Sequence, residues 1–318
     1  MYAKCAFFLC LMLSAVSVHG QEILDPPEIP REYRSFRFAL IRIPVWVNDN
    51  HGLPVTKLRR RDFKLYVDGR RVRVESVMKI TGDPMETAYL FDLSGSMGFG
   101  GKVEGTVMTV SWLLKRHRID DRWKMYAFSD AQIVPVLDHH HSAEWDLLKY
   151  KLRGYGKTAL YDALASSGGF FNEESLNNRA VLLFTDGNDN RSALSEAQML
   201  RVLSVLEVPV FVVAIANGFL PDNPHENEDL GLHTLHEIAK VSGGELFLVR
   251  GANTIQEVWH RLERRMRPQY MLTLTVERGP GEQRRNIDVK LAGFGRRSWT
   301  VRSRKGYLGS LPTSGGKR

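Results

Sequence analysis

Three short segments of the chain carry oxygen-bearing side chains at spacings that suit a metal ion. The first, Asp92-Leu-Ser-Gly-Ser-Met97, offers a carboxylate and two hydroxyls at positions i, i+2 and i+4. Hard oxygen ligands, without sulfur or imidazole, favour Mg²⁺, which requires octahedral geometry and usually retains bound water. We therefore predict a Mg²⁺ site, with Mn²⁺ or Ca²⁺ as alternative ions, that leaves one position open to an oxygen of a partner. Its predicted ligands are Asp92, Ser94, Ser96, Thr158 and Asp186.

The first of these segments also has a structural interpretation. Asp92, Ser94 and Ser96 precede a predicted helix, and Ser, Thr, Asp and Asn residues commonly cap helix N-termini. Taken alone, a helix cap explains these residues as well as a metal site does. Thr158, in a loop that enters a helix, and Asp186, after another apolar run, complete a ligand set and favour metal binding.

Catalytic chemistries that begin with similar residues fit this chain less well. A phosphate-binding GxxxxGK[ST] loop needs a glycine where the sequence has Lys151. A phosphatase of the haloacid dehalogenase type needs a second carboxylate two residues after Asp92, where Ser94 stands. The stretch Gly95-Ser-Met-Gly98 lacks the spacing of a nucleophile elbow. We therefore predict that the protein is not an enzyme. A metal-assisted hydrolase is the least favoured hypothesis, because no general base is evident.

Other polar clusters have ordinary explanations. The run His139-His-His141 could bind a transition metal, but three adjacent residues do not easily face one ion, so a surface loop is favoured. Asp189 and Asn190 either hydrogen-bond beside Asp186 or form a polar turn, and the sequence leaves both alternatives open. The basic groups are expected to be solvated faces that meet anionic envelope surfaces rather than nucleic acid. They are Arg59–Arg61, Arg264–Arg265 and Arg296–Arg297.

Short apolar runs alternate with amphipathic stretches through the middle of the chain, which predicts an α/β domain. Runs without polar alternation indicate parallel strands covered on both faces, and ligands bind at the carboxyl ends of such strands. We predict a doubly wound, mostly parallel sheet, with a capping box formed by Thr254 and Glu257 at its last helix. The predicted strands are 87–91, 123–128, 180–184, 208–215 and 245–249, and the predicted helices are 103–114, 145–152, 160–171, 193–206, 232–241 and 255–266.

Two β segments, 38–82 and 268–308, flank this domain. Residues such as Ile41, Ile43 and Val45 alternate at period two, which predicts strands with one buried face. Neither segment has enough strands for a stable sheet alone, so we expect the two to pair with each other or to pack on the central domain. The predicted strands are 38–47, 62–68, 71–77, 270–276, 287–291 and 299–301.

The N-terminus and the composition indicate an exported globular protein. The chain has 318 residues, a formal net charge of +8, 43% hydrophobic and 25% charged residues. Met1–Gly20 resembles a secretory signal peptide, and its apolar run is too short for a membrane span. We expect cleavage near Gly20, no transmembrane span in the mature chain, and a secreted protein, periplasmic or extracellular. Cys5 and Cys10 leave with this segment, which excludes disulfides and thiolate catalysis.

At the predicted ligands the sequence resembles the von Willebrand factor type A (VWA) family. Its metal-ion-dependent adhesion site (MIDAS) has the pattern Asp-x-Ser-x-Ser followed by a distant Thr and a distant Asp, and all five positions are present here. The flanking stretches Asp62-Phe-Lys-Leu-Tyr-Val-Asp-Gly69 and Arg304-Lys-Gly-Tyr307 look like secreted VWFA-related domain proteins of acidobacteria. The resemblance covers about Phe38 to Tyr307 and implies a Rossmann-like VWA domain.

The predicted organisation follows from these features. It comprises a signal peptide (1–20), a proline-containing lead (21–37), an N-terminal β segment (38–82), a VWA domain (85–267), a C-terminal β segment (268–308) and a flexible tail (309–318).

The leading functional hypothesis is a secreted adhesion or protein-interaction module. Its Mg²⁺ would capture the carboxylate of an Asp or Glu residue of a partner protein. We expect Asp92 to lie on a loop above the core, so that Asp92→Ala abolishes binding with little loss of fold. The alternative is an envelope assembly or scaffold protein whose β flanks make the contacts, with a metal that only stiffens loops and partner binding that survives chelation.

Overall fold

The apolar runs in the middle of the chain form a six-stranded sheet with the order β10-β9-β8-β5-β6-β7 in a computed structural model. Neighbouring strands from β10 to β6 pair in parallel, and β7 pairs antiparallel to β6 at the edge. The strands are β5 (Glu86–Asp92), β6 (Arg122–Phe128), β7 (Ile133–Asp138), β8 (Arg179–Thr185), β9 (Val210–Ile215) and β10 (Leu246–Val249). The α/β class predicted from the sequence is confirmed.

The structure describes residues 38–80, 82–130, 133–138, 142–172, 178–216, 231–277, 283–293 and 298–310. The predicted signal peptide, the proline-containing lead, the three adjacent histidines, Arg296–Arg297 and the tail after residue 310 lie outside these ranges. From Arg37 onward the chain forms one compact unit.

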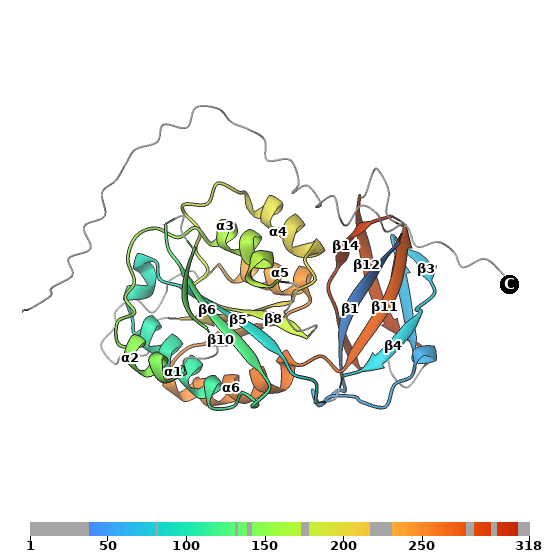
Figure 1. Cartoon of the computed structure of the whole chain (residues 1–318), viewed down its shortest axis with the longest axis horizontal. Coiled ribbons are helices and arrows are strands. Elements are labelled where there is room, and N and C mark those ends of the chain that lie inside the picture. Colours follow the sequence, from blue (N-terminus) through green and yellow to red (C-terminus); the bar gives the residue numbers. More distant parts are fainter. Residues whose placement is uncertain are drawn as a thin grey trace, which may run out of the picture. The chain divides into compact units, whose positions relative to one another are not determined.

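Helices cover both faces of the central sheet, which explains why its strands lack polar alternation. Figure 1 shows α3, α4 and α5 over one face and α1, α2 and α6 over the other. Successive side chains of β5 alternate between the two cores: Tyr89 and Phe91 pack towards α1 and α6, whereas Ala88 and Leu90 pack towards α3, α4 and α5. The helices are α1 (Lys102–Leu114), α2 (Ser142–Leu148), α3 (Leu160–Ala165), α4 (Glu196–Val205), α5 (Leu232–Ser242) and α6 (Ala252–Met266). None of the described helices is both long and apolar enough to cross a membrane.

One helix begins differently from the prediction. The expected capping box of Thr254 and Glu257 is wrong, because α6 begins at Ala252 with Gly251 as its N-cap. The Thr254 hydroxyl lies inside the first turn and donates to the Gly251 carbonyl oxygen (3.0 Å). A capping box is instead present at Ser195, the N-cap residue of α4. A threonine that bonds to a carbonyl oxygen inside the first turn of a helix gives the same Thr-x-x-Glu pattern in the sequence as a threonine that caps the helix.

The two flanking β segments pair with each other, as predicted. β1 pairs with β11 over eight residues, and β2 pairs with β12 over five, both antiparallel. The result is two four-stranded sheets, with the orders β13-β1-β11-β4 and β14-β12-β2-β3, that share one apolar core. We call this pair of sheets the β sandwich. Its strands are β1 (Phe38–Asn48), β2 (Phe63–Val67), β3 (Arg70–Val72), β4 (Ser76–Lys79), β11 (Tyr270–Glu277), β12 (Gln283–Leu291), β13 (Thr300–Arg302) and β14 (Gly306–Gly309).

The strand predicted over 71–77 is wrong in one respect. The chain divides there into β3, which pairs with β2, and β4, which pairs with β11 of the other sheet. Val74 lies between the two strands and is 6% exposed, within the shared core. The alternating pattern therefore continues while the chain crosses from one sheet to the other.

Buried arginines join the β sandwich to the central sheet. Arg304 is 1% exposed, and its Nη2 donates to Glu207 Oε1 (3.1 Å). Arg302 forms an ion pair with Glu245 and stacks on Trp46, with its Cζ 4.7 Å from the ring centroid. Glu207 lies three residues before β9 and Glu245 lies immediately before β10, so these contacts lie at the amino ends of the parallel strands. The carboxyl ends, where the metal site is predicted, lie at the opposite edge of the sheet.

Candidate metal centre

Asp92 is part of the sheet. It is the last residue of β5, pairs with Phe128 of β6 and is 1% exposed, so the expectation that it lies on a loop above the core is wrong. Its Oδ1 accepts a hydrogen bond from the Ser94 N–H (2.9 Å), and its Oδ2 accepts one from the Thr185 hydroxyl (2.6 Å). The carboxylate is therefore held in one orientation by β5 and β8 together.

The surroundings of Asp92 disfavour its negative charge. Burial, together with the charge of Asp186, raises the pKa of Asp92 to about 6, although hydrogen bonds from Ser94 and Thr185 act in the opposite direction. A buried carboxylate with a raised pKa gains free energy when a cation comes close. The protein thus places two carboxylates in a buried space where their mutual repulsion favours cation binding.

Asp186 follows β8 directly and is fully buried. Its Oδ2 accepts a hydrogen bond from Lys102 Nζ at 2.9 Å, and both side chains are 0% exposed. Among the described residues, its Oδ1 is a buried oxygen without a hydrogen-bond partner. Buried oxygens are almost always satisfied, so an unpartnered carboxylate oxygen requires an explanation. A metal ion at this atom provides one.

Ser94 and Ser96 lie close together at the start of the loop after β5. Ser94 is fully buried and Ser96 is partly buried, and their hydroxyl oxygens are 3.2 Å apart. Ser94 is the N-cap residue of a short 3₁₀ helix, Gly95–Gly98, but no capping hydrogen bond from its side chain to the backbone of that helix is found within the described residues. α1 begins later, with Gly101 as its N-cap. The helix-cap interpretation of these two serines is therefore wrong.

Thr158 reaches this region through two neighbouring loops and is 2% exposed. Its N–H donates to Asn190 Oδ1 (2.9 Å), and the Asn190 N–H donates back to the Thr158 carbonyl oxygen (3.0 Å). Asp189 acts on the same loop, because its Oδ2 accepts a hydrogen bond from the Tyr161 N–H (3.1 Å). Both alternatives for Asp189 and Asn190 are represented, because these bonds link them to the Thr158 segment while Asp189 also forms a polar turn by accepting a hydrogen bond from the Ser192 hydroxyl (2.6 Å).

A close approach of two backbones locks the Thr158 loop onto the serine loop. The Gly95 N–H donates to the Gly156 carbonyl oxygen (3.0 Å). A Cβ at Gly154 would lie 2.4 Å from Gly98 N and 2.5 Å from the Ser94 carbonyl oxygen, so only glycine fits there. The three ligand-bearing segments are thus in direct contact with one another.

The residues present fit a divalent cation. Hydrogen bonds and electrostatic coupling link Asp92 to Ser94 and Asp186, and the loop contacts bring the Thr158 segment against them. The donors are carboxylate and hydroxyl oxygens, which hard cations prefer. The described residues contain no group of three or more His, Cys, Asp or Glu side chains that could hold a metal. The candidate site is not such a group, because it has only two carboxylates and its other oxygen donors are hydroxyls.

Lys102 is the one charged residue of this site that the sequence prediction missed. It is the first residue of α1, and its fully buried ammonium contacts a predicted ligand. The sequence contains no signal for it, because polar residues at helical spacing normally form the solvent-facing side of a helix. In the structure Lys102, Thr106 and Thr109 are instead all buried.

Comparisons with known proteins find similarity only among solved structures. No protein-family model and no curated protein matches the chain. A von Willebrand factor type A structure from Catenulispora acidiphila is 14% identical over 86% of this chain and 71% of that chain, with a TM-score of 0.47. The hypothetical protein BatB from Bacteroides thetaiotaomicron is 16% identical over 57% of this chain and 98% of that chain, with a TM-score of 0.46. Proximal thread matrix protein 1 from the mussel byssus, in a form with a zinc-occupied MIDAS motif, is 16% identical over 64% of this chain and 50% of that chain, with a TM-score of 0.42.

Proposed function

We propose that this protein is a metal-dependent protein-binding module with a doubly wound VWA-type domain, in which Mg²⁺ captures a carboxylate of a partner protein. The ligands we assign are Asp92, Ser94, Ser96, Thr158 and Asp186. The observation that carries the proposal is the buried pair of carboxylates, in which Asp186 Oδ1 has no partner among the described residues while burial and Asp186 raise the pKa of Asp92. Mn²⁺ and Ca²⁺ are the alternative ions.

The charges of the site favour an anionic ligand once a divalent ion is bound. The negative charges of Asp92 and Asp186 balance the two positive charges of the ion, which supplies an open coordination position for an oxygen of the partner. Lys102, 2.9 Å from Asp186, then adds one positive charge. Serine and threonine hydroxyls contribute oxygen without further negative charge. A site with this excess of positive charge attracts the side chain of Asp or Glu.

Exposed aromatic side chains beside the site support a protein partner rather than a free small acid. Phe99 is 65% exposed and Tyr155 is 63% exposed. Phe99 lies just after the serine loop, and the Tyr155 N–H donates to the Leu93 carbonyl oxygen (2.8 Å), so both rings belong to the loops that form the site. Aromatic residues are enriched at protein interfaces, where they supply much of the binding free energy. Secretion, inferred from the predicted signal peptide, would place such a partner in the periplasm or outside the cell.

Calorimetric titration of Mg²⁺ tests the metal site directly. We expect saturable binding by the wild type and none by Asp186→Ala. Asp288→Ala is the matched control, because Asp288 lies on β12 with its side chain 47% exposed and pairs with Lys290. Absence of Mg²⁺, Mn²⁺ and Ca²⁺ binding in a folded wild type would refute the assignment.

The partner step needs a second experiment. Proteins captured by the wild type should be released by EDTA and should not be captured by Asp186→Ala. Partner binding that survives chelation would contradict the carboxylate capture. It would instead support the alternative function, an envelope assembly or scaffold protein whose β sandwich makes the contacts.

A further inference from the structure

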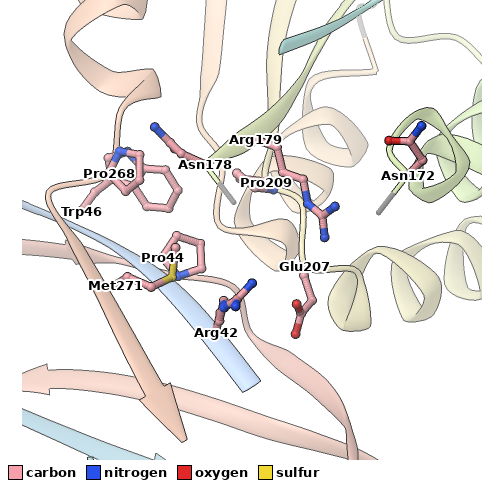
Figure 2. A pocket seen from close by; sticks show the side chains of 10 residues that line it. All are labelled: Arg42, Pro44, Trp46, Asn172, Asn178, Arg179, Glu207, Pro209, Pro268 and Met271. Atoms are coloured by element: carbon pink, nitrogen blue, oxygen red, sulfur yellow. The ribbon is translucent and has the colours of Figure 1, made fainter. Parts of the chain in front are cut away.

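A second candidate site lies at the other end of the central sheet. A cavity of about 160 Å³ opens where β1 of the β sandwich meets the starts of β8 and β9 (Figure 2). It is far larger than the space that one water molecule needs. None of the predicted metal ligands lines it. A ligand bound there would therefore be recognised independently of the metal centre.

One wall of this cavity is apolar and the facing wall is polar and cationic. Figure 2 shows Arg42, from β1, and Arg179, from the first residue of β8, bordering the space with their guanidinium groups. Such a combination suits a molecule with one anionic end and an apolar body. The apolar wall consists of Pro44, Trp46, Pro209, Pro268 and Met271.

The charges around the cavity leave an excess of positive charge. Glu207 is the acidic residue among the described lining residues, and its carboxylate accepts a hydrogen bond from the buried Arg304 (3.1 Å). Arg179 is partly buried and stacks on Phe171, with its Cζ 5.5 Å from the ring centroid. Within the described part of the chain, Arg179 forms no ion pair. Its guanidinium therefore remains available to an incoming anion.

Two buried N–H donors at the cavity have no acceptor among the described residues. They are Asn178 Nδ2 and Trp46 Nε1, on residues that are 6% and 1% exposed. The backbone of Asn178 is fixed, because its carbonyl oxygen accepts a hydrogen bond from the Glu86 N–H (2.9 Å). Unsatisfied buried donors are rare in native proteins. The residues that line the cavity therefore carry donors that an acceptor on a ligand could satisfy.

We propose that this cavity binds a small organic monocarboxylate. The carboxylate would accept hydrogen bonds from the Arg179 guanidinium, and the apolar body would pack against the proline and methionine wall. A planar carboxylate matches the fork of a guanidinium. The apolar wall favours an organic acid over inorganic phosphate, which has no apolar part to bury. The proposal does not depend on the metal-dependent function.

Benzoate and benzamide form the matched probe pair, because they share an apolar ring and differ in charge. Binding to the full chain is measured by calorimetry and by thermal shift in the presence of EDTA, so that no carboxylate is captured through a metal ion. We expect saturable benzoate binding and at least tenfold weaker benzamide binding. Equal binding of the two probes, no benzoate binding, or tighter binding of inorganic phosphate would overturn the proposal.

Two variants locate the binding. Arg179→Gln should weaken benzoate binding at least tenfold, whereas Arg201→Gln, at an exposed position on α4, should leave it unchanged. Asp186→Ala should also leave it unchanged, which separates this cavity from the metal centre. If Arg179→Gln does not fold, the comparison of benzoate with benzamide in the wild type still decides the proposal. Benzoate binding that persists in folded Arg179→Gln would contradict it.

Discussion

The buried ammonium of Lys102 leads to our main prediction, made for the substitution Lys102→Met. Methionine keeps most of the length and apolar volume of the lysine side chain while removing its charge. In the wild type, Lys102 Nζ lies 2.9 Å from Asp186 Oδ2, and both side chains are 0% exposed. The substitution therefore leaves the Asp186 carboxylate buried without its cation. It changes no predicted metal ligand.

The expected cost in the metal-free protein is large. Removing one partner of a buried ion pair typically costs about 3–5 kcal/mol, because the remaining charge is uncompensated. For a protein of this size, a loss of that order corresponds to a fall in melting temperature of about 5–15 °C. The neighbouring carboxylate increases the cost, since burial and, after it, the charge of Asp186 already raise the pKa of Asp92 to about 6.

Saturating Mg²⁺ should recover part of this loss. The ion would compensate the carboxylate that Lys102 no longer pairs with, so the variant should gain more stability from the metal than the wild type does. Thermodynamic linkage requires that the recovered free energy appear as tighter metal binding. If the metal recovers about 2 kcal/mol, the dissociation constant for Mg²⁺ falls roughly thirtyfold.

The assay compares urea unfolding in EDTA and in Mg²⁺ with calorimetric titration of the ion. Lys124→Met is the matched control, because Lys124 Nζ lies 3.0 Å from Glu86 Oε1 at the amino end of the same strand that ends in Asp92. The control should lose equal stability in both conditions and bind Mg²⁺ unchanged. Equal losses for Lys102→Met in EDTA and Mg²⁺, with unchanged or weaker metal binding, would refute the reasoning.

Three further predictions test other parts of the fold. Burial raises the pKa of Asp121, but hydrogen bonds from four residues outweigh it and hold the pKa well below its ordinary range. The ionised Asp121 therefore stabilises the fold above its unfolded pKa of about 4, and this stabilisation is lost as the pH falls. The free energy of unfolding measured in urea should consequently change less between pH 5 and pH 2 for Asp121→Asn than for the wild type. Gly154→Ala places a Cβ 2.4 Å from Gly98 N and should weaken Mg²⁺ binding at least tenfold by calorimetry without altering a ligand; unchanged affinity would show that the two loops separate freely. Arg304→Met removes the buried hydrogen bond to Glu207 and should lower the free energy of unfolding in urea by about 2 kcal/mol. A decrease below about 0.5 kcal/mol, which is the usual effect of a surface substitution, would contradict the role of Arg304 in joining the β sandwich to the central sheet.

The central sheet could be predicted from sequence because burial on both faces leaves a direct trace. The strand over 180–184 contains only apolar residues, and all of them are buried in β8. Asp92 and Asp186 each come at the end of an apolar run that was predicted to be a parallel strand. The two carboxylates were therefore expected at the same edge of the sheet. β7 left no such trace. It is an edge strand with Pro135 in its middle and partly exposed side chains, so neither its apolar content nor its pattern is distinctive.

The parts of the site that could not be predicted depend on contacts between distant segments. Lys102 is 84 residues from Asp186, and a lysine at a helix start normally faces solvent. The close packing of Gly154 against Gly98 likewise depends on two loops that meet only after the sheet has formed. Sequence spacing identifies which side chains have suitable chemistry. It does not show which of them the folded chain leaves uncompensated.

Uncompensated charge distinguishes the candidate metal centre from the other buried acids of the same domain. Asp121 accepts hydrogen bonds from the backbone of Met85 (2.9 Å) and of Arg118 (2.9 Å) and from the Arg267 guanidinium, and its pKa is held low. Asp92 is more deeply buried, lies beside a second carboxylate, and its pKa is raised to about 6. A carboxylate with a lowered pKa stabilises the fold by itself, whereas one with a raised pKa costs stability unless something binds to it. That contrast within one sheet is the physical reason for assigning a ligand to Asp92 and a structural role to Asp121.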